Sequence, residues 1–238
     1  MKKYTGLFIF LLFFSQSFSQ KKDSLRAHKV YVQNILPATL IISGSIISGS
    51  KFEKKLQTNL RDKVGNNFEF KIDNYIQYAP IAELYIADIA GVKAKNHWFD
   101  QTKYLLISNI ISSLITHGLK NITRKTRPNG ADYSFPSGHT SFSFTNASVL
   151  HQEFKTSAPV FAYSGYLFST TTGIFRMLNN KHWLSDVLVS AGIGILVTNM
   201  VYYFKPFKNF NPFKKNKRLS FYPLIENKVY RLKISYHF

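Results

Sequence analysis

The chain is dominated by apolar stretches of helical length that are separated by short polar connections. The length of these stretches and their mixture of apolar and polar residues favour helices over strands. The predicted helices are Gln33–Gly49, Lys51–Lys63, Ile76–Lys93, Leu105–Leu119, Ser137–Phe154, Ala158–Phe175 and Trp183–Phe204. Helices joined by short connections pack side by side, so the sequence predicts an all-α fold, a helical bundle within residues 20–204.

Two polar segments lie between these predicted helices. They read KNITRKTRPNGADYSFPSGH at residues 120–139 and RMLNNKHWLSD at residues 176–186. We expect the bundle to gather them at one end. Their cations Lys120, Arg127 and Arg176 suit a phosphate-like oxyanion, because Arg offers a planar fork of donors and Lys a compact charge.

The residues Ser137, Gly138 and His139 stand at the predicted start of a helix. The first N–H groups of a helix have no partner within it and point toward an anion. A glycine at this turn lets the backbone approach that anion closely. We therefore expect Ser137 and Gly138 to bind the same oxyanion as the three cations, with the ring of His139 beside it.

His182 and Asp186 are one helical turn apart and share a face of a helix. A carboxylate that accepts from one ring nitrogen fixes the tautomer and leaves the other nitrogen free as a nucleophile or base. The sequence has no Cys, and these segments hold no cluster of carboxylates. We expect a site with no metal and no cofactor.

Together these residues carry a resemblance to a known family. The chain resembles the three-part signature of the type 2 phosphatidic acid phosphatase superfamily. The resemblance is carried by Lys120 with Arg127-Pro128, by Pro136-Ser137-Gly138-His139, and by Arg176 with His182 and Asp186. That superfamily includes lipid phosphatases, bacterial acid phosphatases and vanadium haloperoxidases. The resemblance implies a helical bundle and hydrolysis of a phosphomonoester or pyrophosphate.

The expected mechanism is covalent. His182 attacks phosphorus and forms a phosphohistidine, and Asp186 orients its ring. His139 protonates the leaving oxygen and then activates the water that releases phosphate. The phosphate-binding residues are Lys120, Arg127, Ser137, Gly138 and Arg176.

Three neighbouring residues are interpreted differently. Arg124 and Lys125 lie between Lys120 and Arg127, and we expect both to be solvated. Phe175 stands where the family often has a Ser before the arginine, so one side-chain contact to phosphate is missing from the expected set.

The family resemblance, the basic surface and the apolar helices together favour a membrane lipid as the substrate. The formal net charge is +19, which favours acidic partners, and no nucleic-acid-binding module is legible. With apolar helices and a basic surface, we expect a lipid phosphate and a membrane surface as partners: phosphatidate, phosphatidylglycerol phosphate, undecaprenyl diphosphate or a lipid A phosphate. Two alternatives remain open, a soluble periplasmic acid phosphatase and a vanadium-dependent haloperoxidase, and the short chain argues against the second.

The N-terminal residues Met1–Ser19 have the pattern of an export signal, with two lysines before an apolar run. Export predicts a periplasmic location, or a site on the periplasmic side of a bacterial membrane. The same residues could instead form an uncleaved first membrane helix. A mean hydropathy of −0.11 is low for a chain of membrane spans, so both a peripheral domain and a bundle of about five spans stay open. Within Ile76–Lys93, two acids favour a buried helix over a span.

The last segment, residues 205–238, differs from the helical part of the chain in composition and periodicity. Lys205–Arg218 is basic and aromatic, and it suits either an arm on anionic lipid or a solvated linker. In Val229–Phe238 apolar and polar residues alternate, which predicts a strand. We expect it to pair with Leu219–Ile225 as a small β-hairpin packed on the bundle.

Overall fold

The structure is a computed structural model, and it describes residues 24–65, 67–212, 219–226 and 229–236. The expected signal segment Met1–Ser19 lies outside the described residues. The chain divides into two units, residues 1–35 and 36–238. In the first unit the described residues form the beginning of helix α2 (Ser24–Ile47), which continues into the second unit.

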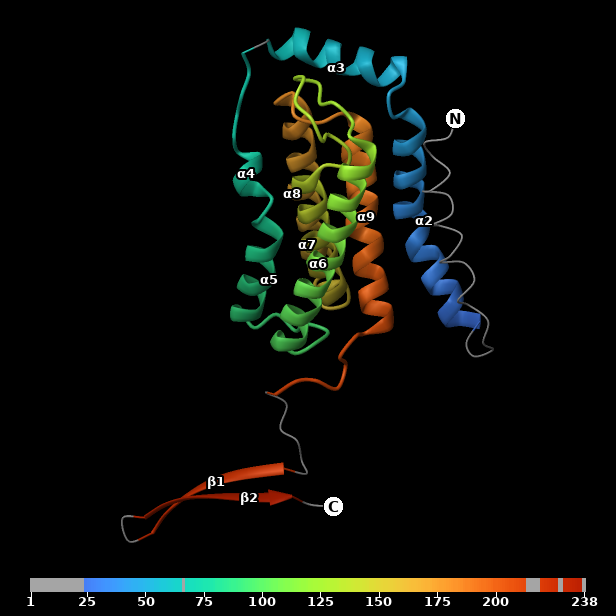
Figure 1. The fold of residues 1–238 in the computed structure, drawn as a ribbon. Helices are drawn as coiled ribbons and strands as arrows, with labels where there is room; N and C mark the ends of the chain where they lie inside the picture. The colour runs from blue at the N-terminus through green and yellow to red at the C-terminus, as the bar shows by residue number, and fades with distance from the viewer. Residues whose placement is uncertain (1–23, 66, 213–218, 227–228, 237–238) are drawn as a thin grey trace. The chain divides into compact units, whose positions relative to one another are not determined.

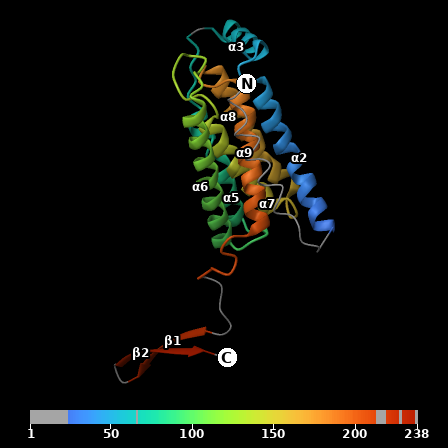
Figure 2. The ribbon, with the colours of Figure 1, turned by 45° about the vertical axis from the view of Figure 1, so that its right-hand side comes forward.

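Four long helices form the centre of the second unit and lie side by side in Figures 1 and 2. They are α6 (Trp98–Thr123), α7 (Gly138–Phe154), α8 (Pro159–Leu178) and α9 (Leu184–Phe204). Helix α7 is central, because it packs against each of the other three. The predicted helices at these positions are confirmed, and α6 begins earlier than predicted.

Glycines bring these helices close together. A Cβ atom at Gly194 of α9 would lie 2.7 Å from the Thr145 backbone nitrogen and 2.9 Å from the Ser141 carbonyl oxygen, both on α7. At Gly192 it would lie 2.7 Å from the Pro37 carbonyl oxygen, so α9 also contacts the second half of α2. Small residues at such crossings allow backbones to approach, as in helices packed within membranes.

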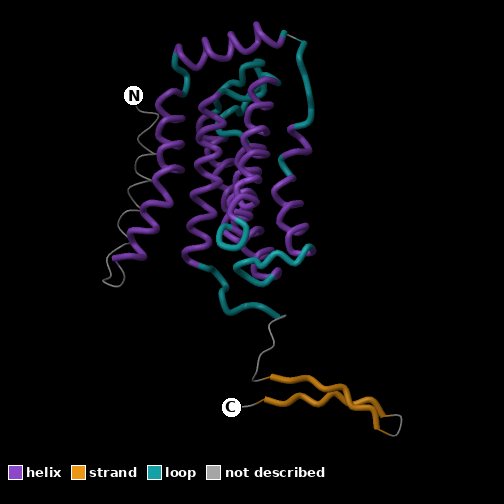
Figure 3. The backbone as a smooth tube through the Cα atoms, turned by 180° about the vertical axis from the view of Figure 1, so that it is seen from behind, coloured by secondary structure: helices purple, strands orange, loops and turns teal. Residues whose placement is uncertain are grey.

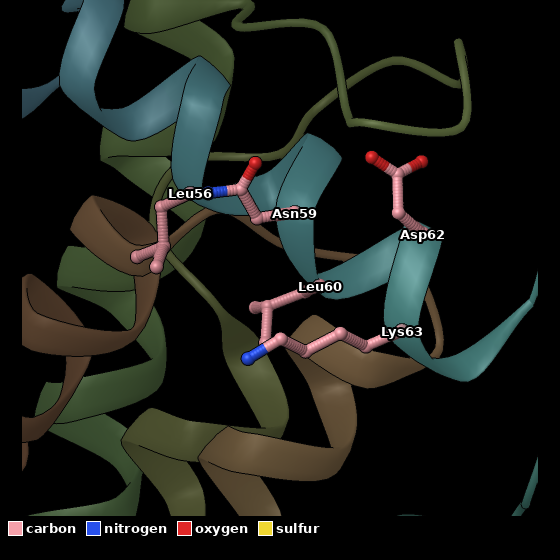
Figure 4. Close-up of a pocket in the computed structure, with 5 residues that line it drawn as sticks. All are labelled: Leu56, Asn59, Leu60, Asp62 and Lys63. Atoms are coloured by element: carbon pink, nitrogen blue, oxygen red, sulfur yellow. The ribbon is translucent and has the colours of Figure 1, made fainter.

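Helix α3 (Lys51–Val64) crosses the end of the bundle at which the loop 124–137 lies (Figure 1). The Ser50 hydroxyl caps its N-terminus by accepting from the Glu53 N–H, and Gly65 follows its C-terminus with a φ of 87°. A hollow of about 340 Å³ runs along α3 and is lined by Leu56, Asn59, Leu60, Asp62 and Lys63 (Figure 4). It contains none of the predicted site residues.

The stretch Ile76–Lys93 is not one helix, which corrects the prediction. It divides between a short helix α4 (Asp73–Ile76) and α5 (Ala79–Ile89). Helix α5 buries Leu84 and Ala87 but leaves Ile86 and Ile89 exposed. Eleven residues rise roughly 16 Å, about half of the hydrocarbon core of a bilayer, so α5 alone is too short to span one.

The bundle has an apolar core in which Leu84, Leu150 and Phe154 are fully buried, and it also buries a cluster of hydroxyl groups. Ser112 and Ser141 share a hydrogen bond of 2.7 Å, and Thr116 and Thr145 add bonds to the same pair. All four residues are buried. Outside, α6 exposes a stripe of Leu106, Ile110 and Leu114, and α8 exposes Val160, Tyr163 and Leu167.

Two helices of the described chain are long and apolar enough to cross a membrane, Val30–Ile47 and Leu184–Phe204. After α9, Lys103 of α6 donates to the carbonyl oxygens of Phe207 and Phe210, and Asn211 donates to Asp100. The first part of the basic segment is therefore attached to α6, and its residues 213–218 lie outside the described chain.

Two strands follow, β1 (Leu219–Glu226) and β2 (Val229–Tyr236), shown in orange in Figure 3. They pair antiparallel, with Leu219 opposite Tyr236 and Glu226 opposite Val229. The packing of this hairpin on the helices stays a prediction.

Candidate active site

The two polar segments meet at one end of the bundle because consecutive helices run in opposite directions. The first segment joins the C-terminus of α6 to the N-terminus of α7, and the second joins α8 to α9. The Ser137 N–H donates to the Asp186 carbonyl oxygen at 3.3 Å, and the Ser134 hydroxyl donates to the Asp186 carboxylate. The two polar segments therefore meet at one end of the bundle, as predicted.

His182 and Asp186 contact each other, but not from one face of a helix as predicted, because α9 begins at Leu184 and His182 precedes its N-cap Trp183. His182 Nδ1 is 3.3 Å from Asp186 Oδ2, and both residues are buried, with His182 only 1% exposed. The same carboxylate oxygen accepts from the Trp183 N–H at 2.9 Å, which caps the start of α9. No described residue bonds to His182 Nε2, so that nitrogen is available to a substrate.

The cations Lys120 and Arg127 approach from the first segment. Lys120 ends α6 and donates to the Tyr133 carbonyl oxygen at 2.8 Å. Arg127 Nε donates to the Asp132 carbonyl oxygen at 3.1 Å, which fixes the guanidinium while leaving its other N–H groups to bind an anion. Both side chains are half-buried, in positions set by carbonyl groups of their own loop.

Arg176 lies in the last turn of α8 and is nearly buried. Its Nη1 is 2.8 Å from Asp73 Oδ2, in an ion pair with a residue of α4 that the sequence analysis did not identify. Asn179 holds the other oxygen of Asp73 at 3.1 Å. Arg176 Nε is buried and has no partner among the described residues. A buried donor without a partner is costly, so this atom suits an oxyanion ligand.

At the start of α7, Ser137 is the N-cap, and its Oγ accepts from the N–H and the hydroxyl of Thr140. The Ser137 hydroxyl proton remains to be donated. A Cβ at Gly138 would meet nothing within 4 Å, so the space beside this backbone is open. His139 Nε2 lies 3.0 Å from Asn74 Oδ1, and since an amide oxygen only accepts, this ring nitrogen carries the proton.

The pKa shifts of these groups have causes in common. Burial, with the charges of Arg176, Arg127 and Lys120 and against that of Asp73, lowers the pKa of His139 to about 4. Burial also lowers the pKa of His182 to about 4, although the bond to Asp186 opposes the change. Burial lowers the pKa of Lys120 to about 8, and the charge of Arg127 adds to this effect. Both imidazoles therefore share Arg176 and Lys120 as cationic neighbours.

A hollow of about 180 Å³ opens beside these cations. Its lining combines site residues with the segment around α4: Glu69, Lys71, Asp73, Asn74, Arg127, Arg176, Asn179 and Lys181. Four of these side chains are cationic and two are anionic. Of the predicted site residues, Arg127 and Arg176 line this hollow, whereas Lys120, Ser137, Gly138, His139, His182 and Asp186 do not.

Lys125 is not solvated, and this corrects the prediction. Its Nζ lies 3.1 Å from Asp186 Oδ1, 2.7 Å from Ser185 Oγ and 3.1 Å from Glu53 Oε2. Its position between two buried carboxylates follows from the turn after α6, where Arg124 adopts a left-handed φ of 46° and ends the helix.

Asp73, Asn74 and Glu53 are the site neighbours that the sequence analysis missed. Each belongs to an element outside the two polar segments, so motif spacing carries no signal for them. For Glu53 a signal existed. It lies on the same face of α3 as Leu56 and Leu60, and a carboxylate on the packed face of an amphipathic helix needs a buried cation.

The described residues contain no group of three or more His, Cys, Asp and Glu side chains able to hold a metal ion. The cations that line the hollow and the unpartnered Arg176 Nε suit an anion.

The chain resembles known proteins in both sequence and structure. Residues 101–210 match the family model described as the PAP2 superfamily. The lipid A 1-phosphatase of Porphyromonas gingivalis is 31% identical over 182 residues, which cover 73% of this chain and 40% of that protein. This chain thus spans less than half the length of that relative.

Among solved structures, the crystal structure of Aquifex aeolicus LpxE matches with a TM-score of 0.50 and 19% identity, covering 66% of this chain and 98% of that one. A transmembrane PAP2 type phosphatidylglycerolphosphate phosphatase from Bacillus subtilis matches with a TM-score of 0.41 and 18% identity, covering 90% and 100%. The likeness to LpxE confirms the predicted helical fold.

Proposed function

Residues 101–210 of this chain belong to the PAP2 superfamily, and on that premise we propose that the protein is a phosphatase acting on a phosphomonoester or pyrophosphate of a membrane lipid. The observation that carries the proposal is the arrangement around Arg176. Arg176, whose Nε is buried and unpartnered among the described residues, lines a hollow with Arg127, and its charge contributes to lowering the pKa of both imidazoles. Such a cradle stabilises the charge that spreads over phosphoryl oxygens during transfer.

The first step is attack by His182. Its Nδ1–H donates to Asp186, so the lone pair of Nε2 is free, and the lowered pKa of the ring keeps it neutral at physiological pH. A bond forms between Nε2 and phosphorus while the bond from phosphorus to the leaving oxygen breaks. Asp186 stabilises the positive charge that the ring acquires.

His139 is the proposed general acid, and it must carry an extra proton to act as one. In the substrate-free protein the neighbouring cations help to lower the pKa of His139 to about 4. A bound phosphate dianion offsets those cations, so the ring takes up a proton as the substrate binds. It then protonates the leaving oxygen, and as a neutral base it removes a proton from the water that cleaves the phosphohistidine.

The apolar exterior supports a lipid substrate. Leu106, Ile110 and Leu114 form a stripe along α6 with exposed fractions between 57% and 68%, and α8 presents a similar surface. The interior holds an apolar core together with buried hydroxyl pairs. Large apolar side chains on the outside, with small hydroxyl-bearing residues where helices cross, suit a bundle surrounded by acyl chains. We propose that this belt faces lipid and that the site lies at the membrane surface, on the periplasmic side.

The relative from Porphyromonas gingivalis, a lipid A 1-phosphatase, makes a phosphate of lipid A the first substrate to test. The purified full chain in mixed micelles would be given lipid A, phosphatidate, phosphatidylglycerol phosphate and undecaprenyl diphosphate, beside a small aryl phosphate, all with a chelator present. We expect phosphate release from one or more lipids at a kcat/KM well above that for the aryl ester, and none from His182→Ala. Equal or better use of the aryl ester would favour a soluble acid phosphatase. Inactivity on every ester would overturn the proposal.

A further inference from the structure

The side of Asp186 that faces away from His182 contacts a second set of charged groups. Lys125 Nζ lies 3.1 Å from Asp186 Oδ1, and it also lies 3.1 Å and 3.3 Å from the two carboxylate oxygens of Glu53. Glu53 belongs to α3, far from the motifs in sequence, and is 1% exposed. A chain of contacts therefore runs from α3 through Lys125 to the proposed nucleophile.

We propose that Lys125 and Glu53 are positioning residues for phosphoryl transfer, which act by fixing the carboxylate of Asp186 and, through it, the ring of His182. The inference rests on the proposed function of the site. Neither Lys125 nor Glu53 is among the residues that line the hollow beside Arg127 and Arg176, and both contact the groups behind His182 instead.

The burial of the two carboxylates explains why this cation is needed. Asp186 is 0% exposed, so two negative charges lie in a region of low dielectric constant. Buried charges are tolerated only when they are paired and hydrogen-bonded. Lys125 is the cation that both carboxylates contact, and removing it would leave them to repel each other across the space it now fills.

The hydrogen bonds of Lys125 are also fully used. An ammonium group has three N–H donors, and this one contacts Glu53, Asp186 and the Ser185 hydroxyl, the last at 2.7 Å. The rings of Phe135 and Trp183 lie 5.8 Å and 5.6 Å from the same nitrogen. With no donor left over, Lys125 is not a ligand for the phosphate.

The carboxylate of Glu53, like the ammonium group of Lys125, makes several hydrogen bonds. Its carboxylate accepts from the Gly49 N–H at 2.7 Å and from the Ser185 N–H at 3.0 Å, in addition to Lys125. Ser185 lies next to Asp186 in the first turn of α9, so Glu53 fixes both the backbone and the cation beside the carboxylate that orients His182. Asp186 Oδ1 thus accepts from Lys125, while Oδ2 contacts His182 and also accepts from the Trp183 N–H and the Ser134 hydroxyl.

The test compares Lys125→Met, Lys125→Arg and Glu53→Gln with a matched control, Lys103→Met. Lys103 forms an equally buried pair with Asp100, at 2.7 Å, but outside the site. For Lys125→Met we expect kcat on the lipid substrate to fall on the order of 10- to 100-fold, the effect of a slightly misplaced nucleophile. KM and the affinity for vanadate should stay close to wild type. Lys125→Arg should restore most of kcat, because it retains the charge, and Glu53→Gln should lie between.

Two results would overturn the inference. One is a kcat for Lys125→Met equal to that of Lys103→Met, which would make Lys125 merely structural. The other is a loss of vanadate affinity with unchanged kcat, which would make it a phosphate ligand. Vanadate binding also reports folding, so an unfolded variant is recognised. If the wild-type chain releases phosphate and His182→Ala does not, either of these two results refutes the role of Lys125 and leaves the proposed function standing. An inactive wild-type chain would refute the proposed function instead.

Discussion

The carboxylate of Asp73 lies 2.8 Å from the guanidinium of Arg176, and both side chains are more than nine-tenths buried. Asn74, the next residue, contacts His139 at 3.0 Å. In the substrate-free protein, two adjacent residues of α4 thus contact a proposed phosphate ligand and the proposed general acid. An anionic substrate must share Arg176 with Asp73 or displace it.

The first prediction follows from that competition. Asp73→Asn removes a negative charge beside the phosphate position while keeping an acceptor for Arg176. A unit charge a few ångströms away contributes about 1 kcal/mol in a hydrated site, so the Kd for phosphate or vanadate should fall roughly fivefold. Competitive inhibition by vanadate measures this change. Asp62→Asn is the matched control, because Asp62 is exposed on α3 and lines the hollow that contains none of the predicted site residues, so its loss should have little effect. Weaker vanadate inhibition in Asp73→Asn would mean that Asp73 positions Arg176 and does not compete.

The second prediction concerns alkaline pH. Burial lowers the pKa of Lys120 to about 8, so its positive charge is present below that pH and is lost above it. Because Lys120 is a proposed phosphate ligand, kcat/KM should fall as the pH rises through about 8. Lys120→Arg keeps the charge to much higher pH, so its kcat/KM should stay level over the same interval. The measurement is the pH profile of kcat/KM for both proteins. Identical alkaline limbs would assign this ionisation to another group.

The third prediction concerns Asp186→Asn. An amide in place of the carboxylate no longer fixes the His182 tautomer, and its NH₂ group would face the Lys125 ammonium or the ring. We expect kcat to fall on the order of 10³- to 10⁴-fold, as in catalytic triads that lose their carboxylate. Rapid-quench trapping should show slower formation of a phosphorylated protein, with vanadate affinity retained. A near wild-type burst of phosphorylation would contradict the proposed role of Asp186.

The sequence predicted the proposed substrate-binding residues, but not the charged residues that contact them. Lys120, Arg127, His139, Arg176 and His182 could be identified because phosphate chemistry requires those residue types at particular distances along the chain. The helices around them were predicted because each is long and apolar. These features depend on local sequence or on a known motif.

The supporting contacts depend on tertiary packing and had no comparable local signal. Lys125 lies among several cations, and only the placement of α3 shows that it faces Glu53 and Asp186. The break between α4 and α5 was also missed, although Pro80 stands at the start of α5 and the broken segment carries Asp73 to Arg176. In the first case α3 supplies the charge of Glu53, and in the second α4 supplies the charge of Asp73. The motifs predict neither charge.

The fourth prediction tests the packing that brings the motifs together. In Gly194→Ala the new methyl group would lie 2.7 Å and 2.9 Å from backbone atoms of α7, and backbone cannot yield as a flexible side chain can. Helices α7 and α9 must separate, so we expect a loss of about 1–3 kcal/mol of stability and a lower Tm in detergent. Gly118→Ala on α6 is the matched control, since a Cβ there meets nothing within 4 Å. It should raise stability by about 0.5–1 kcal/mol through the better helix propensity of alanine. Because α7 carries His139 and α9 carries Asp186, Gly194→Ala should also lower kcat. An unchanged Tm and an unchanged kcat would show that this close crossing does not hold the site together.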